Sequence, residues 1–270
     1  MLKIPQFETK SELYDYLQTN KEGLISQKKF ENKYADAVSY STLAYIKGEA
    51  ENKAISTTEQ LLESDKIKVE LVINTTKLMD SHGDVHVNGI WTKSISESKN
   101  IPLLQEHEMS FDKIIAEDVT VTAKTINWKT LGFDFAGTTQ ALVFNTEIEK
   151  DRNTFMFNQY AKGYVKQHSV GMRYVQIKLA VNSDDAQYTE EKAVFDKYYS
   201  EIANKEAVDA QGYFWAVTEA KVIEGSAVVK GSNFATPTQS VQAVKNIEPS
   251  EDTQPEPPEG TQKLSIYSFN

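Results

Sequence analysis

The 270-residue chain contains no cysteine, which excludes disulfides, a cysteine nucleophile and thiolate metal sites. No apolar run approaches the ~20 residues that span a bilayer, and the first ten residues lack the apolar stretch of a secretion signal. Basic residues are outnumbered by acidic ones, with 29 Lys and Arg against 39 Asp and Glu. The net charge is therefore −10, and the basic residues form no cluster in the sequence. We therefore expect a soluble intracellular protein that binds neither membranes nor nucleic acid.

The two ends of the chain differ in composition from its centre. Residues 247–260 hold four of the seven prolines and five acidic residues, with no basic one. Because proline removes a backbone donor and like charges repel, we predict a disordered acidic tail over 247–270, whose apolar end could dock elsewhere. Residues 1–62 instead predict a helical N-terminal extension, with a capping box formed by Thr9 and Glu12. We expect residues 1–60 and the tail to be dispensable for folding of the central part.

The central segment, residues 63–246, has mostly β character. Apolar residues alternate between 67 and 73, which predicts a half-buried strand, and residues 80–89 have the Asp, Asn and Gly content of a turn. The longest predicted strands cover 167–181 and 215–229, and helical spacing of aromatic residues predicts helices at 153–162 and 189–206. These elements predict an α+β domain, built as a small β-barrel surrounded by helices.

Two of the four histidines, His82 and His86, lie close to Asp80 and Asp84. Two imidazoles and two carboxylates within seven positions are a possible metal-ligand set. The alternative is a tight turn in which Asp84 caps backbone N–H groups, and Gly83 favours that interpretation. We therefore predict no metal site and no cofactor. The sequence also lacks a phosphate-binding loop, a dinucleotide fingerprint and a G-x-S-x-G nucleophile elbow.

Three further residues have chemical potential that is weak when each is taken alone. His107 ends an apolar segment, where a general base can be held rigidly, although most such histidines are structural. Ser169 lies two residues before Gly171, which allows close backbone approach or a turn. A serine in this position can act as a nucleophile only if a histidine lies within hydrogen-bond distance of its hydroxyl. Glu224 lies within an apolar strand, where a carboxylate either faces solvent or has a partner such as an imidazole.

Four short segments, in the same order, resemble the tailed-phage prohead (capsid maturation) serine protease family. Residues 78–91 are similar to the family's D-x-x-G-D-V turn followed by G-A-W or G-A-F, and residues 101–107 to P-L-L-x-x-H. Residues 168–173 are similar to S-[IV]-G-[YF]-R, and residues 217–229 to E-V-S-x-V. Each segment is short, but four in the correct order are hard to obtain by chance. The resemblance covers roughly residues 67–240.

The resemblance implies a role for each matching residue. Ser169 is the expected nucleophile, His107 the general base, and Glu224 the residue that orients the His107 ring, while the backbone near Gly171 and Arg173 helps to bind the oxyanion. It also implies the β-barrel shared with herpesvirus assemblins. The implied activity is that of a serine endopeptidase that cleaves scaffold and capsid-protein extensions, and itself, inside the assembling procapsid in the host cytoplasm. Self-association is a further expectation.

The sequence departs from the family pattern at two positions near the expected third catalytic residue. Gly225 stands where the family has a branched apolar residue, and Ser232 stands where it has proline. These departures leave Glu219 as an alternative to Glu224.

His168 is a rival general base because it directly precedes Ser169. Adjacent residues of a strand point to opposite faces, so this geometry favours His107. The alternative function is a non-catalytic capsid-assembly or scaffold protein built on the same domain. Retention of both Ser169 and His107 favours the enzyme.

Overall fold

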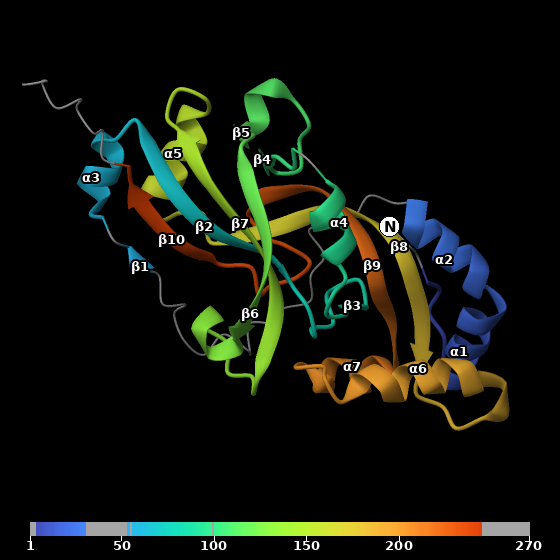
Figure 1. Cartoon of the computed structure of the whole chain (residues 1–270). Coiled ribbons are helices and arrows are strands. Elements are labelled where there is room, and N and C mark those ends of the chain that lie inside the picture. The colour runs from blue at the N-terminus through green and yellow to red at the C-terminus, as the bar shows by residue number, and fades with distance from the viewer. Residues whose placement is uncertain (1–3, 31–52, 55, 99, 245–270) are drawn as a thin grey trace, which may run out of the picture.

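The computed structural model of the chain describes residues 4–30, 53–54, 56–98 and 100–244 (Figure 1). The predicted tail over 247–270 lies outside the described residues. Helices and strands are mixed, as the predicted α+β class requires. The α-helices are α1 (Lys10–Thr19), α2 (Lys21–Phe30), α3 (Thr58–Glu63), α4 (Thr92–Glu97), α5 (Thr154–Ala161), α6 (Thr189–Tyr199) and α7 (Lys205–Gln211). None of the helices in the described ranges is long and apolar enough to cross a membrane.

The first sheet has the strand order β1-β10-β2-β7-β6. Its strands are β1 (Lys53–Ala54), β10 (Thr238–Ala243), β2 (Lys66–Thr75), β7 (Thr138–Glu149) and β6 (Val119–Asn127). Strand β2 confirms the predicted alternation, because Ile67, Val69, Leu71 and Ile73 are all buried in the main core. The apolar face of this sheet therefore points inward along its central strand.

The second sheet is organised around the 16-residue strand β9 (Tyr213–Val228). One edge of β9 pairs with β3 (Asp84–His86) near its start and with β4 (Leu103–Gln105) near its end. Strand β5 (Ile114–Ala116) pairs with β4, and β8 (Gln167–Val181) pairs with the other edge of β9 over almost its whole length. The predicted strand at 167–181 is therefore confirmed, and β9 covers most of the predicted strand at 215–229.

The two sheets do not close into a barrel, so the predicted β-barrel is wrong. Among the described strands, no hydrogen-bonded ladder joins the first sheet to the second. Their apolar faces contribute to one large buried cluster, to which β2, β7, β8 and β9 all supply side chains. Two amphipathic sheets can bury their apolar faces against each other without closure, and the alternation seen in the sequence fits both arrangements.

The predicted helix at 153–162 is confirmed as α5, whereas the one at 189–206 is divided into α6 and α7. The side chain of Asn204 explains the interruption. Its Oδ1 atom accepts a hydrogen bond from the Met79 backbone at 2.9 Å, and its Nδ2 atom donates to the Met79 carbonyl at 2.8 Å. These bonds tie the chain between α6 and α7 to the segment before β3.

Helix α2 packs against β8 at one side of the molecule, and α1 packs against α2 (Figure 1). The capping box of Thr9 and Glu12 is present. Leu17 and Lys28 are almost completely buried, and the Tyr188 hydroxyl donates to Asp15 at 2.6 Å. This packing is at odds with the expectation that residues 1–60 are dispensable, because removing these helices would expose apolar surface and would take Lys28 away from the buried carboxylate of Asp84.

Candidate functional site

The β8–β9 ladder places three of the predicted site residues on one face of the second sheet. Ser169 is paired with Ser226, and Gly171 is paired with Glu224. Paired residues of antiparallel strands point to the same face. Their neighbours Val170 and Met172 lie in the main core, so Ser169 and Glu224 belong to the face directed away from that core. Both are buried nevertheless, with 7% and 1% exposure.

His107 reaches the same face from the turn that follows β4. Strand β4 pairs in parallel with the end of β9, which aligns Leu104 with Ser226. The chain then turns through two residues with positive φ, Glu106 at 51° and His107 at 62°. Positive φ is uncommon for residues other than glycine, and here hydrogen bonds support it. The Glu106 N–H donates to the Ala227 carbonyl at 3.0 Å, and the His107 N–H donates to Oγ of Ser226 at 3.1 Å.

The His107 ring and the Glu224 carboxylate are in direct contact. Nδ1 of His107 lies 2.6 Å from Oε1 of Glu224. A carboxylate is an acceptor, so the neutral ring donates its Nδ1 hydrogen and keeps its basic lone pair on Nε2. The second carboxylate oxygen, Oε2, accepts a hydrogen bond from Oγ of Ser226 at 2.6 Å. Ser226 thus holds both the carboxylate and the backbone of the histidine.

One glycine leaves the space that this carboxylate occupies, and a second leaves space for an aromatic ring of the core. A Cβ atom at Gly171 would lie 1.9 Å from Oε1 of Glu224, so any side chain at this position would force the carboxylate to move. A Cβ atom at Gly225 would lie 2.5 Å from Cε2 of Phe144 in the core. The departure from the family pattern at Gly225 is therefore a packing feature, because Phe144 fills the place of the missing side chain. It does not displace Glu224 from His107.

His168 belongs to the opposite face, as the strand alternation predicts. Its Nε2 atom lies 3.0 Å from the Tyr160 hydroxyl, and its Nδ1 atom lies 3.0 Å from the Thr236 carbonyl. A carbonyl only accepts, so Nδ1 carries the hydrogen and Nε2 accepts from the tyrosine. Complete burial lowers the pKa of His168 to about 4, although the bond to Thr236 acts in the opposite direction. A neutral ring with a hydrogen bond at each nitrogen is suited to a structural role.

The three other residues considered in the sequence make their contacts with residues other than His107. Glu219 accepts a hydrogen bond from Gln176 at 2.9 Å and lies 3.6 Å from Nζ of Lys93. Arg173 is exposed and pairs with Lys221 across the ladder. Ser232, found where the family has proline, accepts a hydrogen bond from the backbone of Ser81 through its carbonyl at 3.3 Å. Of the two candidate carboxylates, the geometry therefore favours Glu224.

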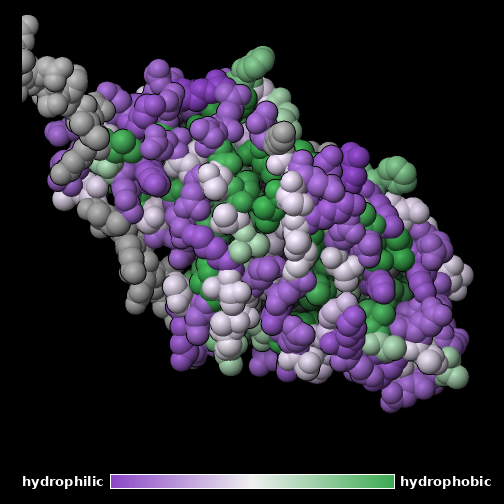
Figure 2. Space-filling model, in the orientation of Figure 1, coloured by the Kyte–Doolittle hydropathy of each residue, from purple (hydrophilic) through white to green (hydrophobic). Residues whose placement is uncertain are grey.

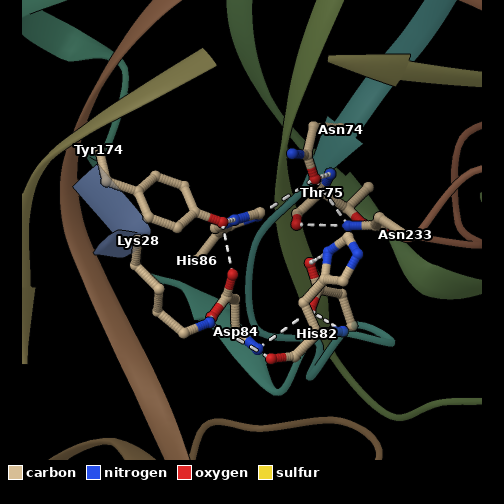
Figure 3. Close-up of polar contacts among 9 residues, drawn as sticks. Lys28, Asn74, Thr75, His82, Asp84, His86, Tyr174 and Asn233 are labelled. Carbon is tan, nitrogen blue, oxygen red and sulfur yellow. Dashed lines mark hydrogen bonds and ion pairs between the residues drawn. The ribbon is translucent and has the colours of Figure 1, made fainter. Parts of the chain in front are cut away.

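The Asp80, His82 and Asp84 side chains do come together, with one ligand atom from each within 4.8 Å of the others. A lysine, however, already supplies a positive charge there. Nζ of Lys28 forms an ion pair with Asp84, and Figure 3 shows the Lys28 and Tyr174 side chains both directed at that carboxylate. The Tyr174 hydroxyl donates to Asp84 at 2.8 Å. The observed contacts are those of a buried polar network.

The sequence predicted that Asp84 caps the backbone N–H groups of this turn, but in the structure Asp80 does so. Oδ1 of Asp80 accepts from the backbone N–H groups of His82 at 2.8 Å and of Asp84 at 2.9 Å. Asp84 itself is fully buried and pairs with Lys28 and Tyr174. The N–H groups of a turn are capped by the residue at its start, which is where Asp80 stands.

The same network continues into the interior of the domain (Figure 3). The Tyr174 hydroxyl lies 3.2 Å from Nε2 of His86, and Nδ1 of His86 lies 3.3 Å from Oδ1 of Asn74. Asn233 donates to the same Asn74 oxygen at 2.7 Å. Burial and the charge of Asp84 raise the pKa of the Tyr174 hydroxyl well above its ordinary value, so it remains a donor at any physiological pH.

Sequence reasoning missed Ser226 and Lys28. Ser226 lies two residues after Glu224 on the same strand, so the period of two was a usable signal for a shared face. Lys28 carried no such signal, because a lysine on an amphipathic helix is ordinarily solvent-exposed. Comparison with protein-family models, with curated proteins and with solved structures finds no match to this chain.

Proposed function

We propose that this chain is a serine endopeptidase with Ser169 as nucleophile, His107 as general base and Glu224 as the residue that orients the imidazole. The observation that supports this most strongly is the 2.6 Å contact between Nδ1 of His107 and Glu224, on the face that also holds Ser169. A carboxylate at Nδ1 selects the tautomer in which Nε2 can accept a proton, as a serine hydrolase requires.

The proposed reaction follows from these positions. Oγ of Ser169 attacks the carbonyl carbon of a peptide bond while Nε2 of His107 takes its proton, and Glu224 stabilises the imidazolium that forms. The same proton then passes to the leaving amine. Water attacks the resulting acyl-enzyme in the second half of the reaction, with His107 acting as base again. This cycle uses only the side chains described and water.

We further propose, from the sequence resemblance, that the substrates are scaffold and capsid-protein extensions, and the chain itself, within an assembling procapsid. A second candidate is a non-catalytic assembly protein on the same domain. The observation that favours it is the low exposure of the centre, since Ser169 is 7% exposed and the His107 side chain 6%. An active enzyme with this structure has to open this face when a substrate binds.

The test is cleavage by the purified full-length chain, followed by intact-mass measurement of the chain itself and of added unfolded casein. The enzyme predicts cleavage products for the wild type and none for Ser169→Ala. The matched control is Ser200→Ala, at the exposed end of α6, which should cleave like the wild type. Equal cleavage by the wild type and Ser169→Ala would refute the assignment, and an intact chain together with intact casein would favour the assembly protein.

A further inference from the structure

Large apolar side chains are exposed directly after the candidate general base. The described part of the chain exposes seven large hydrophobic residues, and two of them, Met109 at 69% and Phe111 at 85%, follow His107 by two and four positions. Figure 2 shows apolar side chains projecting at the top of the molecule, where Figure 1 places the segment between β4 and β5. Adjacent exposed apolar side chains commonly mark a binding surface.

These two side chains border a hollow whose floor is apolar. Leu104 and Pro102 from the β4 region line it, and Ile114 closes it on the side of β5. Its volume is about 640 Å³, within the range of about 300–1,000 Å³ that small-ligand pockets occupy. The hollow is therefore large enough to hold one or two apolar side chains of a bound molecule.

The position of Leu104 connects the hollow with the candidate catalytic centre. Leu104 is aligned with Ser226 across one edge of β9, and Ser169 is aligned with Ser226 across the other edge. All three point to the same face. Neighbouring strands are ~4.8 Å apart, so Leu104 and Ser169 are separated by roughly 10 Å. An extended peptide advances ~3.4 Å per residue, so a residue two or three positions from the cleaved bond reaches the hollow.

The charges around the hollow restrict what it can take. Its lining contains no lysine or arginine, whereas Glu117 and Asp118 lie at its border. Both carboxylates are exposed, and Glu117 forms an ion pair with Arg152 at 3.3 Å. An acidic side chain would meet like charge and an apolar floor, which disfavours its entry. A Leu, Met or Phe side chain would bury its surface against Pro102, Ile114 and Phe111 without an electrostatic cost.

We infer that this hollow is the specificity pocket of the proposed endopeptidase, and that it takes a large apolar side chain of the substrate, two or three residues from the cleaved bond. The inference rests on the proposed function, because the occupant is the peptide held for attack by Ser169. Met109 and Phe111 act as specificity-determining residues, and their exposure in the free chain is the surface that substrate covers.

The test compares the wild type with a Met109→Ser/Phe111→Ser double variant, whose changes are both at exposed positions and leave the core intact. Each protein digests a library of proteome-derived peptides, and the residues around every cleaved bond are read by mass spectrometry. The wild type should show enrichment of Leu, Met and Phe two or three positions from the cleaved bond. The double variant should lose this enrichment, with a fall in kcat/KM of at least ~10-fold for an apolar substrate.

Two controls separate the pocket from the chemistry. Hydrolysis of p-nitrophenyl acetate, which has no peptide side chain to place in the pocket, reports the chemistry alone; both proteins should hydrolyse it, and Ser169→Ala should not. Phe155→Ser, at a 61% exposed position on α5, should keep the wild-type peptide preference. A wild type that cleaves peptides without apolar preference, or a double variant that keeps it, refutes the pocket alone. A chain that hydrolyses neither peptides nor the ester refutes the proposed function.

The alternative to a substrate on the surface formed by Met109 and Phe111 is a second copy of the chain. Sedimentation velocity of the wild type and the double variant distinguishes this case. The substrate pocket predicts the same sedimentation coefficient for both proteins. A wild-type dimer that dissociates in the double variant would overturn the inference and assign Met109 and Phe111 to a self-association surface.

Discussion

Nδ1 of His107 lies 2.6 Å from Oε1 of Glu224, although 117 positions separate the two residues in the chain. The contact depends on the parallel register of β4 and β9, which brings the turn at His107 beside Ser226. It also depends on the register of β8 and β9, which sets Gly171 beneath the carboxylate. A slip of one residue in β9 would direct Glu224 into the apolar core, so the fold specifies this pair strongly.

Replacing Glu224 should slow turnover without unfolding the protein. Glu224→Gln keeps the shape and one hydrogen bond but loses the charge that stabilises the imidazolium, so we expect kcat to fall by about 10²–10⁴. Glu219→Gln is the matched control, because Glu219 contacts Gln176 and Lys93 instead, and it should leave kcat unchanged. Steady-state kinetics on one peptide substrate decide. A larger loss in Glu219→Gln would transfer the role to that residue.

A methyl group at Gly171 should disable the centre by moving Glu224. The added Cβ atom would stand 1.9 Å from Oε1 of Glu224, so the carboxylate must leave His107. We expect Gly171→Ala to lower kcat at least as much as Glu224→Gln. The control is Gly23→Ala on α2, where a Cβ atom meets nothing within 4 Å and the helix gains up to ~1 kcal/mol. Full activity of Gly171→Ala would show that the contact is not needed.

Lys28 should make a large contribution to stability. Its ammonium pairs with the fully buried Asp84 carboxylate, and removing one member of a buried pair leaves an uncompensated charge. We expect Lys28→Met to lower the free energy of unfolding by ~3–5 kcal/mol in urea titrations. The double variant Lys28→Met/Asp84→Asn should recover much of this loss, because it removes both charges. A loss below ~1 kcal/mol would mean that Asp84 is stabilised by its other contacts alone.

His168 should make the protein less stable in mild acid. Its pKa is about 4 in the folded protein, where burial disfavours the charged ring, and ~6.5 in the unfolded chain. Between these values the unfolded state binds more protons, so stability falls as pH decreases from ~6.5 towards ~4, by roughly 3 kcal/mol in total. Urea unfolding at pH 7 and pH 4.5 measures this loss. His168→Asn should show a smaller difference between the two pH values; an equal difference would contradict this account.

Local elements could be predicted from the sequence because their signals are local. Alternation gave the buried face of β2, the apolar β pattern gave the limits of β8, and the motif of Thr9 and Glu12 gave a helix start that the structure contains. Barrel closure depends on which strand edges pair over long distances, and no local pattern records that. The predicted barrel failed for this reason.

The candidate site could be predicted only in part. Strand alternation separated His168 from Ser169, and the apolar surroundings of Glu224 indicated a partner for its carboxylate. The role of Ser226 depends on the β4–β9 register, which the sequence does not reveal. The ion pair of Lys28 joins residues 56 positions apart, and it was missed for the same reason.

The most direct test of the central claim is covalent labelling of Ser169 by a fluorophosphonate. In this reaction Oγ of an activated serine attacks phosphorus, the P–F bond breaks, and the serine proton passes to the histidine. We predict one adduct per chain, located at Ser169 by peptide mapping, and its loss in His107→Ala with the fold retained by circular dichroism. No adduct on Ser169, or equal labelling of the wild type and His107→Ala, would contradict the account.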